Sequence, residues 1–151
     1  MNRFNVWGRL RSLFFLHLSH LPMSGHARRP YIVKCGGVRI LDYKNTFIGE
    51  DVIFDTIHPE LIVIEPKVSI TMRTIILTHF VDSEKGGQTY GKVHIKRNAF
   101  IGAGTIITKP VTIGKYAVVG AGSIVTKDIP DGEVWAGNPA RFIKKRNIVS
   151  Y

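Results

Sequence analysis

A six-residue repeat runs without interruption from Ile95 to Pro130 and restricts the folds that this chain can adopt. Read in blocks of six, the segment is IKRNAF, IGAGTI, ITKPVT, IGKYAV, VGAGSI and VTKDIP. An aliphatic residue opens every block, at Ile95, Ile101, Ile107, Ile113, Val119 and Val125. A period of six fits neither the helical period of 3.6 nor the strand period of two. The chain must therefore turn once in every block.

Glycines in these blocks supply the turns. Gly102, Gly114 and Gly120 follow the aliphatic residue directly, and Gly104 and Gly122 lie two places further on. Glycine adopts backbone conformations that other residues avoid, so it suits sharp corners. Each block then predicts a short strand and a corner, and three blocks close a triangular coil. Stacked coils bury the aliphatic residues as one core, which predicts an all-β solenoid of about four to five coils.

The pattern resembles the hexapeptide-repeat acyltransferases, and most of all the sugar O-acetyltransferases that act on galactosides, maltose, nodulation factors and surface polysaccharides. The resemblance rests on the segment VSITMRTIILTHFVD, the repeats through VTKDIP and the tail VWAGNPARFIKK. It implies a left-handed parallel β-helix, opposite in hand to the usual crossover, in homotrimers with active sites between subunits. It also implies acetyl transfer from acetyl-CoA to a carbohydrate hydroxyl, with no metal in the chemistry.

Three parts are expected along the chain. Residues 1–37 contain an amphipathic helix, from about Val6 to His17, and a linker rich in Pro, Gly and basic residues. Residues 38–130 form the β-helix, from which a polar loop of residues 82–94 protrudes. Residues 131–151 form a tail that caps the last coil.

His79 is the candidate catalytic base. Acetyl transfer from a thioester to a hydroxyl requires removal of the hydroxyl proton, and an imidazole, with an ordinary pKa of about 6.5, can accept it. His79 ends a strand-like block directly before the protruding loop, and by resemblance it takes the place of the family's catalytic His. The family often has Gly-His-Pro there, whereas this chain has Thr78-His79-Phe80. Asp55 and Asp82 are the candidates for orienting the imidazole.

The acceptor pocket is expected around the same corner. His58 lies about one coil before His79, so it can share that face with Asp55, while Asp82 stands in the loop. By resemblance, Phe100 stands beside the site, where related enzymes often have Trp. A solvent-exposed corner is the alternative interpretation of His58, and His94 is expected to be structural.

Coenzyme A requires cations for its phosphates and a groove for its pantetheine arm. Gly102-Ala103-Gly104 and Gly120-Ala121-Gly122 lie 18 residues apart, the length expected for one coil. Stacked corners without side chains would form a smooth wall. By resemblance, cofactor binding is assigned to Ala103, Gly104, Ala121, Lys127, Arg141 and Lys144. Plain corner geometry is the alternative for the glycines, and solvated surface is the alternative for Lys127 and Arg141.

The net charge and the cysteine content indicate which kinds of partner the protein binds and in which cellular compartment it works. A formal net charge of +10 predicts an anionic partner, such as a phosphorylated cofactor, an anionic membrane surface or nucleic acid. Nucleic acid is disfavoured because the chain lacks an aromatic-studded basic strand and a helical recognition motif. The single Cys35 favours a reducing compartment. We therefore expect a cytoplasmic enzyme, with peripheral contact to the inner face of the membrane through residues 1–20 as an option.

The sequence gives less support to other classes of protein. A zinc carbonic anhydrase on the same solenoid needs three His ligands, and no His lies five residues from His79 or His94. A secretory signal is disfavoured because His17 and His20 interrupt the first apolar run. A nucleotide-sugar N-acyltransferase and a non-catalytic anion-binding solenoid stay open as alternatives. The sequence leaves the acceptor sugar open.

Overall fold

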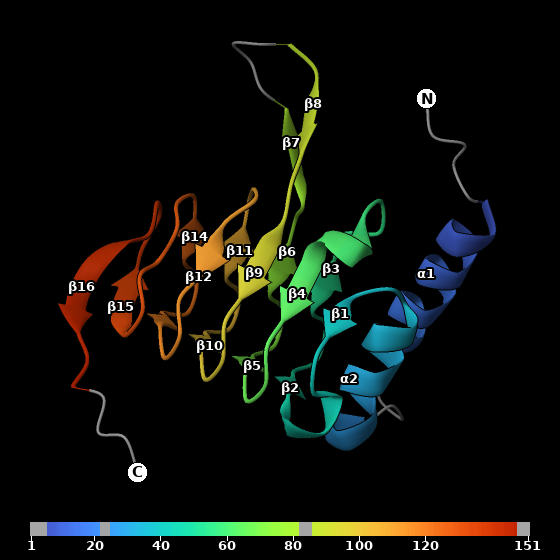
Figure 1. Ribbon diagram of the computed structural model, residues 1–151, viewed down its shortest axis with the longest axis horizontal. Helices are drawn as coiled ribbons and strands as arrows, with labels where there is room; N and C mark the ends of the chain where they lie inside the picture. The colour runs from blue at the N-terminus through green and yellow to red at the C-terminus, as the bar shows by residue number, and fades with distance from the viewer. Residues whose placement is uncertain (1–5, 22–24, 82–85, 148–151) are drawn as a thin grey trace.

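The computed structural model describes residues 6–21, 25–81 and 86–147, which form two helices followed by a three-sided prism (Figure 1). Helix α1 spans Val6–Leu18, which confirms the predicted helix. Helix α2 spans Gly25–Cys35, where the sequence predicted a linker. That prediction was wrong because packing outweighs local propensity. Although Pro30 lies inside α2, Val33 is fully buried and the Arg29 guanidinium donates to the carbonyls of Ser19 and Ile48.

Three parallel sheets form the sides of the prism, and each coil passes through them in the same order. Side A contains β1 (Arg39–Ile40), β4 (Ile62–Ile64), β9 (Val93–Ile95) and β12 (Thr112–Ile113). Side B contains β2 (Phe47–Ile48), β5 (Ser69–Ile70), β10 (Phe100–Ile101), β13 (Val118–Val119) and β15 (Glu133–Ala136). Side C contains β3 (Ile53–Phe54), β6 (Ile75–Ile76), β11 (Ile106–Ile107) and β14 (Ile124–Val125).

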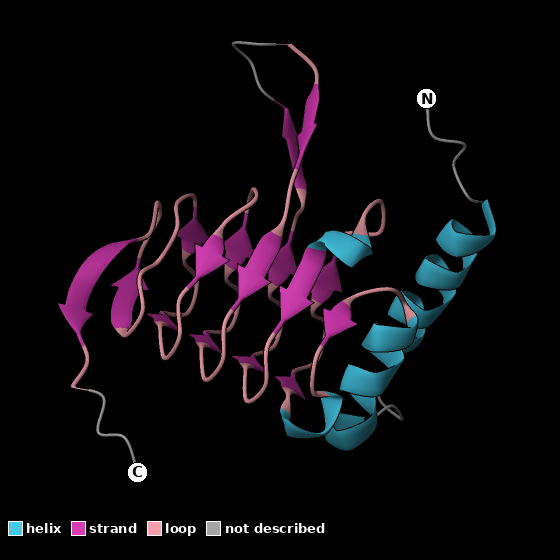
Figure 2. Cartoon of the chain, viewed as in Figure 1, coloured by secondary structure: helices cyan, strands magenta, loops and turns pink. Residues whose placement is uncertain are grey.

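The coil is left-handed, as the path of the chain in Figure 1 shows. Figure 2 shows the strands on the flat sides and the loops at the corners. Two corners contain short 3₁₀ turns, at Tyr43–Asn45 and Pro59–Leu61. The fold is therefore the predicted left-handed parallel β-helix with a helix at its N-terminal end.

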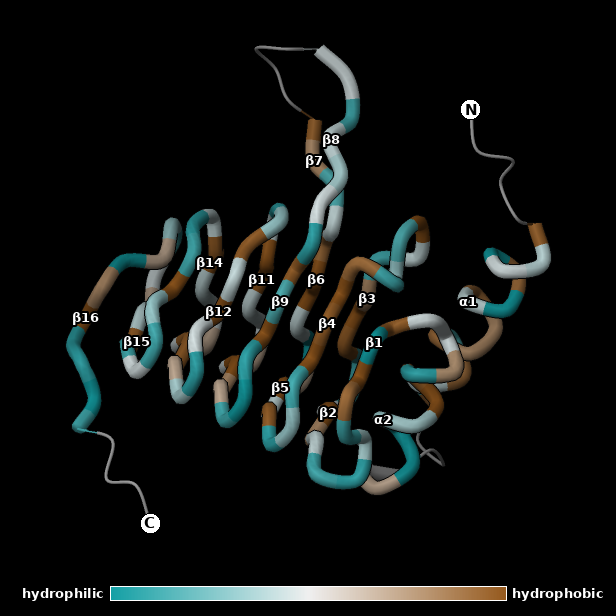
Figure 3. Tube along the Cα trace, viewed as in Figure 1, coloured by the Kyte–Doolittle hydropathy of each residue, from teal (hydrophilic) through white to brown (hydrophobic). Residues whose placement is uncertain are grey.

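The aliphatic residue that opens each block points into the prism. The six openers of the repeat are each at most 1% exposed: Ile95, Ile101, Ile107, Ile113, Val119 and Val125. Parallel pairing keeps them in register, with Ile101 opposite Val119 and Ile107 opposite Val125. Figure 3 shows the resulting hydrophobic column along the strands. The inward column predicted from the sequence is confirmed.

The protruding segment is a β-hairpin (Figure 1). β7 (His79–Val81) pairs antiparallel with β8 (Gln88–Tyr90), so the excursion starts at His79 rather than at residue 82. The chain is back in side A at β9, which places His94 in the prism wall rather than in the loop. Cross-strand pairing of the two short segments explains the earlier start.

The C-terminal tail caps the solenoid as an additional strand. β16 (Arg141–Lys145) pairs antiparallel with β15 and forms the outer edge of side B. All five of its residues are exposed.

Candidate active site

Most of the predicted site residues lie at the two edges of side C. We call the corner that precedes side C the BC corner, and the corner that follows it the CA corner. Asp55 follows β3 and His79 follows β6, so both belong to the CA corner. Ala103 and Ala121 precede β11 and β14, so both belong to the BC corner.

His79 is held by a buried carboxylate. Its Nδ1 lies 2.6 Å from Oδ2 of Asp55. The His79 side chain is 25% exposed, whereas that of Asp55 is 2% exposed. Because an ionised carboxylate only accepts hydrogen bonds, the proton of a neutral imidazole here belongs on Nδ1. Nε2 is then the nitrogen that can take a proton from a substrate.

Asp55 is ionised because several donors converge on it. Burial opposes its charge, but hydrogen bonds from Thr78, Ile57 and His79 outweigh burial and hold the pKa of Asp55 below its ordinary value of 3.8. Oδ2 accepts from the amide and hydroxyl of Thr78 at 2.9 and 2.7 Å, and Oδ1 accepts from the amide of Ile57 at 2.9 Å. The expectation that Asp55 lines the acceptor pocket was wrong, because this carboxylate lies buried against the imidazole. Asp55 positions His79 instead.

Tyr90 joins His79 to His58. The hairpin register places Tyr90 opposite His79, and their ring centroids are 6.0 Å apart. The same tyrosine ring meets His58 edge to face at 4.8 Å, while Nδ1 of His58 lies 2.9 Å from Glu60 Oε1. His58 and His79 therefore share one corner, as expected. Sequence reasoning missed Tyr90 and Thr78, and a prediction of the hairpin register would have found Tyr90.

An apolar groove of about 450 Å³ follows the BC corner. Its lining residues are Phe47, Gly49, Glu50, Thr71, Met72, Phe100, Gly102, Ala103 and Ala121. A Cβ on Gly102 would lie 2.4 Å from the Ala121 amide nitrogen, so the corners stack backbone against backbone. Two residues after Gly102, Gly104 has a φ of +69°, which glycine tolerates best. The groove thus brings together Ala103 and Ala121, with Gly104 adjacent in the chain. It also contains Phe100, which was expected in the acceptor pocket with His58 and lies at the BC corner instead.

The remaining predicted residues divide between two places. Arg141 pairs with Ala136 and Lys144 with Val134, so both lie on the outer edge strand of side B, with Arg141 next to the BC corner and Lys144 farther from it. Lys127 is exposed at the CA corner after β14, away from the groove. Side C separates Lys127 from Ala103 within one chain, so its assignment to cofactor binding stays a prediction that would require a neighbouring subunit. Asp82 lies outside the described residues.

His94 belongs to a separate cluster on side A. Its Nε2 lies 2.9 Å from Oε1 of Glu65, and the other oxygen of Glu65 accepts from the Arg97 amide at 3.0 Å. Burial opposes the charge on Glu65, but these hydrogen bonds hold its pKa below the ordinary value. The cluster ties two successive coils together, which fits the structural role expected for His94.

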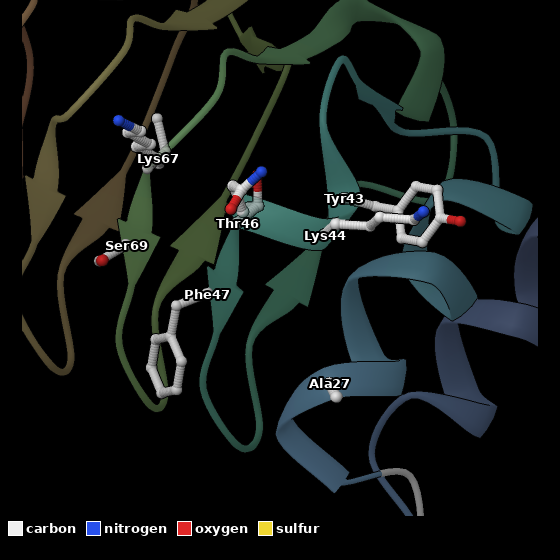
Figure 4. A pocket seen from close by; sticks show the side chains of 9 residues that line it. Ala27, Tyr43, Lys44, Thr46, Phe47, Lys67 and Ser69 are labelled. Carbon is white, nitrogen blue, oxygen red and sulfur yellow. The ribbon is translucent and has the colours of Figure 1, made fainter.

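A second hollow, of about 650 Å³, lies between α2 and the other edge of side B (Figure 4). It contains none of the predicted site residues. Its lining residues are Ala27, Tyr43, Lys44, Asn45, Thr46, Phe47, Lys67, Val68 and Ser69. Phe47 lines both this hollow and the groove at the BC corner.

The part of the chain that the structure describes contains neither a metal-binding cluster nor a membrane-spanning helix. No group of three or more His, Cys, Asp or Glu side chains is placed to hold a metal ion there. Neither described helix combines the length and the apolar character needed to cross a bilayer.

The lowered pKa values predict acid-sensitive stability. The free energy of unfolding is expected to decrease as the pH falls below the ordinary pKa of Asp, 3.8. A carboxyl group whose pKa is lower in the folded state stabilises the fold fully when the pH is above its unfolded-state pKa. This stabilisation disappears as the pH falls through the folded-state pKa. Asp55→Asn should remove part of this dependence. Urea unfolding at neutral and acidic pH measures it, and an equal acid dependence in both proteins would contradict the role of Asp55.

Comparisons with known proteins agree with this fold. Residues 92–127 match the family described as bacterial transferase hexapeptide (six repeats). A maltose O-acetyltransferase from Clostridium difficile 630 is 28% identical, with a TM-score of 0.66 over 95% of this chain and 89% of that chain. A galactoside acetyltransferase solved in complex with coenzyme A is 25% identical, with a TM-score of 0.66 over 96% of this chain and 84% of that chain.

One curated protein is also similar in sequence. The delta-poly-L-ornithine synthetase of Acinetobacter baumannii (strain AB307-0294) is 32% identical over 101 residues, which are 64% of this chain and 7% of that protein. This chain therefore spans only a small part of that relative. Residues 92–127 thus match the hexapeptide-repeat family model, and the fold of the chain is similar to that of solved maltose and galactoside acetyltransferases.

Proposed function

We propose that this chain transfers an acetyl group from acetyl-CoA to a carbohydrate hydroxyl, such as one on a surface polysaccharide or its precursor. The observation that carries the proposal is the contact between His79 and the buried, ionised Asp55. Support also comes from the similar structures, one a maltose O-acetyltransferase and one a galactoside acetyltransferase that binds coenzyme A.

In the proposed reaction, Nε2 of His79 removes the proton from the acceptor hydroxyl. The oxygen attacks the thioester carbonyl and forms a tetrahedral intermediate. When this intermediate collapses, the carbon–sulfur bond breaks, and the thiolate takes the proton from the imidazolium. Asp55 stabilises the transient positive charge on His79 and keeps its ring in place. The products are the acetyl ester and free coenzyme A.

The groove at the BC corner suits the pantetheine arm. Exposed Phe47, Met72 and Phe100 line it, and the backbone of Ala103 and Ala121 is accessible because the stacked corners have small side chains. Arg141 lies where this corner ends, so its cation can meet a phosphate group at the nucleotide end. The proposed binding residues are therefore Phe100, Ala103, Gly104, Ala121 and Arg141, with Lys144 on the same strand.

The groove and His79 lie on opposite edges of side C, so we propose that two chains complete each site. The outward residues of side C are all aliphatic: Ile53, Ile75, Ile106 and Ile124. Ile53 is 48% exposed in the single chain. Such a surface favours burial against another subunit. In a homotrimer, the groove of one subunit would face His79 of the next, and Lys127 at the CA corner could then approach the neighbour's cofactor.

A thiol-release assay tests the activity and its acceptor. Acetyl-CoA is incubated with sugars that offer hydroxyls only, with amino sugars, and with nucleotide-linked amino sugars. The expected result is thiol release with a hydroxyl acceptor and a product whose acetyl group is removed by mild base, as an ester is. A base-stable amide on an amino sugar would establish the N-acyltransferase alternative. No release with any acceptor would contradict the proposal.

A further inference from the structure

Helix α1 presents an exposed apolar face at the N-terminal end of the prism. On the inner side of the helix, Leu16 and Ser12 are buried, and Leu16 packs close to Gly36. On the opposite side of the helix, Trp7, Leu10 and Phe14 follow the spacing i, i+3, i+7 and are 81%, 53% and 64% exposed. Large side chains exposed together along one helix face indicate a contact surface.

The same end of the protein is strongly basic. Residues 1–41 contain seven Lys or Arg and no Asp or Glu, so they carry +7 of the net charge of +10. Arg9 and Arg11 are exposed on α1, and Arg28, Lys34 and Arg39 are exposed on the segments that follow. The first acidic residue of the chain is Asp42.

The position of α1 leaves this surface accessible. α2 packs against β2, and α1 packs on α2, so α1 is the outermost element at this end (Figure 1). The C-terminal strand β16 lies at the other end of the prism (Figure 1). A large partner at α1 would therefore leave both the C-terminal end and the hairpin uncovered.

We propose that α1 docks the protein on an anionic lipid bilayer. Trp7, Leu10 and Phe14 would enter the interface, while the arginines beside them meet the head groups. Stable binding of a peripheral protein generally takes two such signals, apolar burial and positive charge. A second copy of the chain is a poorer occupant, because pairing two α1 faces would bring together basic segments that contain no acidic residue. This proposal does not depend on the reaction proposed above.

Tryptophan fluorescence provides a direct readout. The chain has two tryptophans, Trp7 and Trp135, so Trp135→Phe leaves Trp7 as the only reporter. Vesicles of phosphatidylcholine mixed with phosphatidylglycerol should shift the Trp7 emission to the blue and sediment the protein. Vesicles of phosphatidylcholine alone should bind far less, and high salt should release the protein. No shift and no sedimentation with the mixed vesicles would overturn the proposal.

Variants separate the two signals. Leu10→Ser with Phe14→Ser should weaken vesicle binding at least about tenfold. Arg9→Gln with Arg11→Gln should weaken binding to the mixed vesicles by about fivefold per charge. Phe142→Ser with Ile143→Ser is the matched control, because these exposed apolar residues lie in a basic strand at the opposite end.

The control should bind vesicles like the wild type. Undiminished binding of the Leu10→Ser, Phe14→Ser variant would overturn the proposal. A third outcome would also overturn the proposal: the wild type does not bind vesicles, and the Leu10→Ser, Phe14→Ser variant has a lower oligomer mass than the wild type in analytical sedimentation. That outcome would show that α1 joins copies of the chain instead.

Discussion

Replacing His79 with alanine is expected to lower the turnover of thiol release by a factor of about 10² to 10⁴, the usual contribution of a general base. The loss follows because His79 is the imidazole whose orientation the buried Asp55 determines. Binding of coenzyme A should be unchanged, because the proposed groove residues lie at the other edge of side C. Steady-state kinetics and calorimetric titration with coenzyme A measure the two quantities.

Two further variants make this result specific. His94→Asn changes a histidine of the prism wall that contacts Glu65 rather than Asp55, so its turnover should stay near the wild-type value. Asp55→Asn should lose much of the activity, since an amide that donates to Nδ1 would force the proton onto Nε2. Wild-type turnover in His79→Ala would exclude the imidazole from the reaction.

Mixing two inactive variants is expected to restore activity. Ala103→Trp should fill the groove at the BC corner and block the pantetheine arm, while His79→Ala removes the base. If each site uses the groove of one subunit and His79 of its neighbour, hybrid oligomers contain some sites with both parts intact. In a closed cyclic trimer that contains both chain types, one of the three neighbouring pairs joins an intact groove to an intact His79, so purified hybrids should regain about one third of the wild-type sites.

Hybrids are obtained by co-expressing the two chains with different affinity tags and purifying on both tags in turn. Each variant expressed alone should remain inactive, which serves as the control. Hybrid oligomers that form but show no activity would place the groove and His79 of each site in the same chain.

The repeat predicted the prism well because its information is local. Each aliphatic opener, such as Ile101 or Ile107, needs only its own corner and the coils above and below to be buried. Outside the repeat, structure depends on contacts between distant segments. Arg29 reaches the carbonyl of Ile48, and this packing holds residues 25–35 in a helix that their proline and glycine content argues against.

The candidate site shows the same division. His79 was found from its place before the protruding segment, but the roles of its neighbours depend on the fold. Asp55 lies 24 residues from His79 in the sequence, and only the stacking of successive coils brings the two within 2.6 Å. Tyr90 reaches His79 and His58 through the hairpin register. Lys127 and Ala121 were assigned to cofactor binding together by resemblance, and β14 carries the chain across side C between them.

A crystal structure of the protein with coenzyme A bound is the most direct test of the proposed site. The prediction is that the pantetheine arm follows the BC corner past Ala103 and Ala121, and that its sulfur ends about 3 to 4 Å from Nε2 of His79 in the neighbouring subunit. A cofactor bound elsewhere, or a sulfur remote from every His79, would contradict the account.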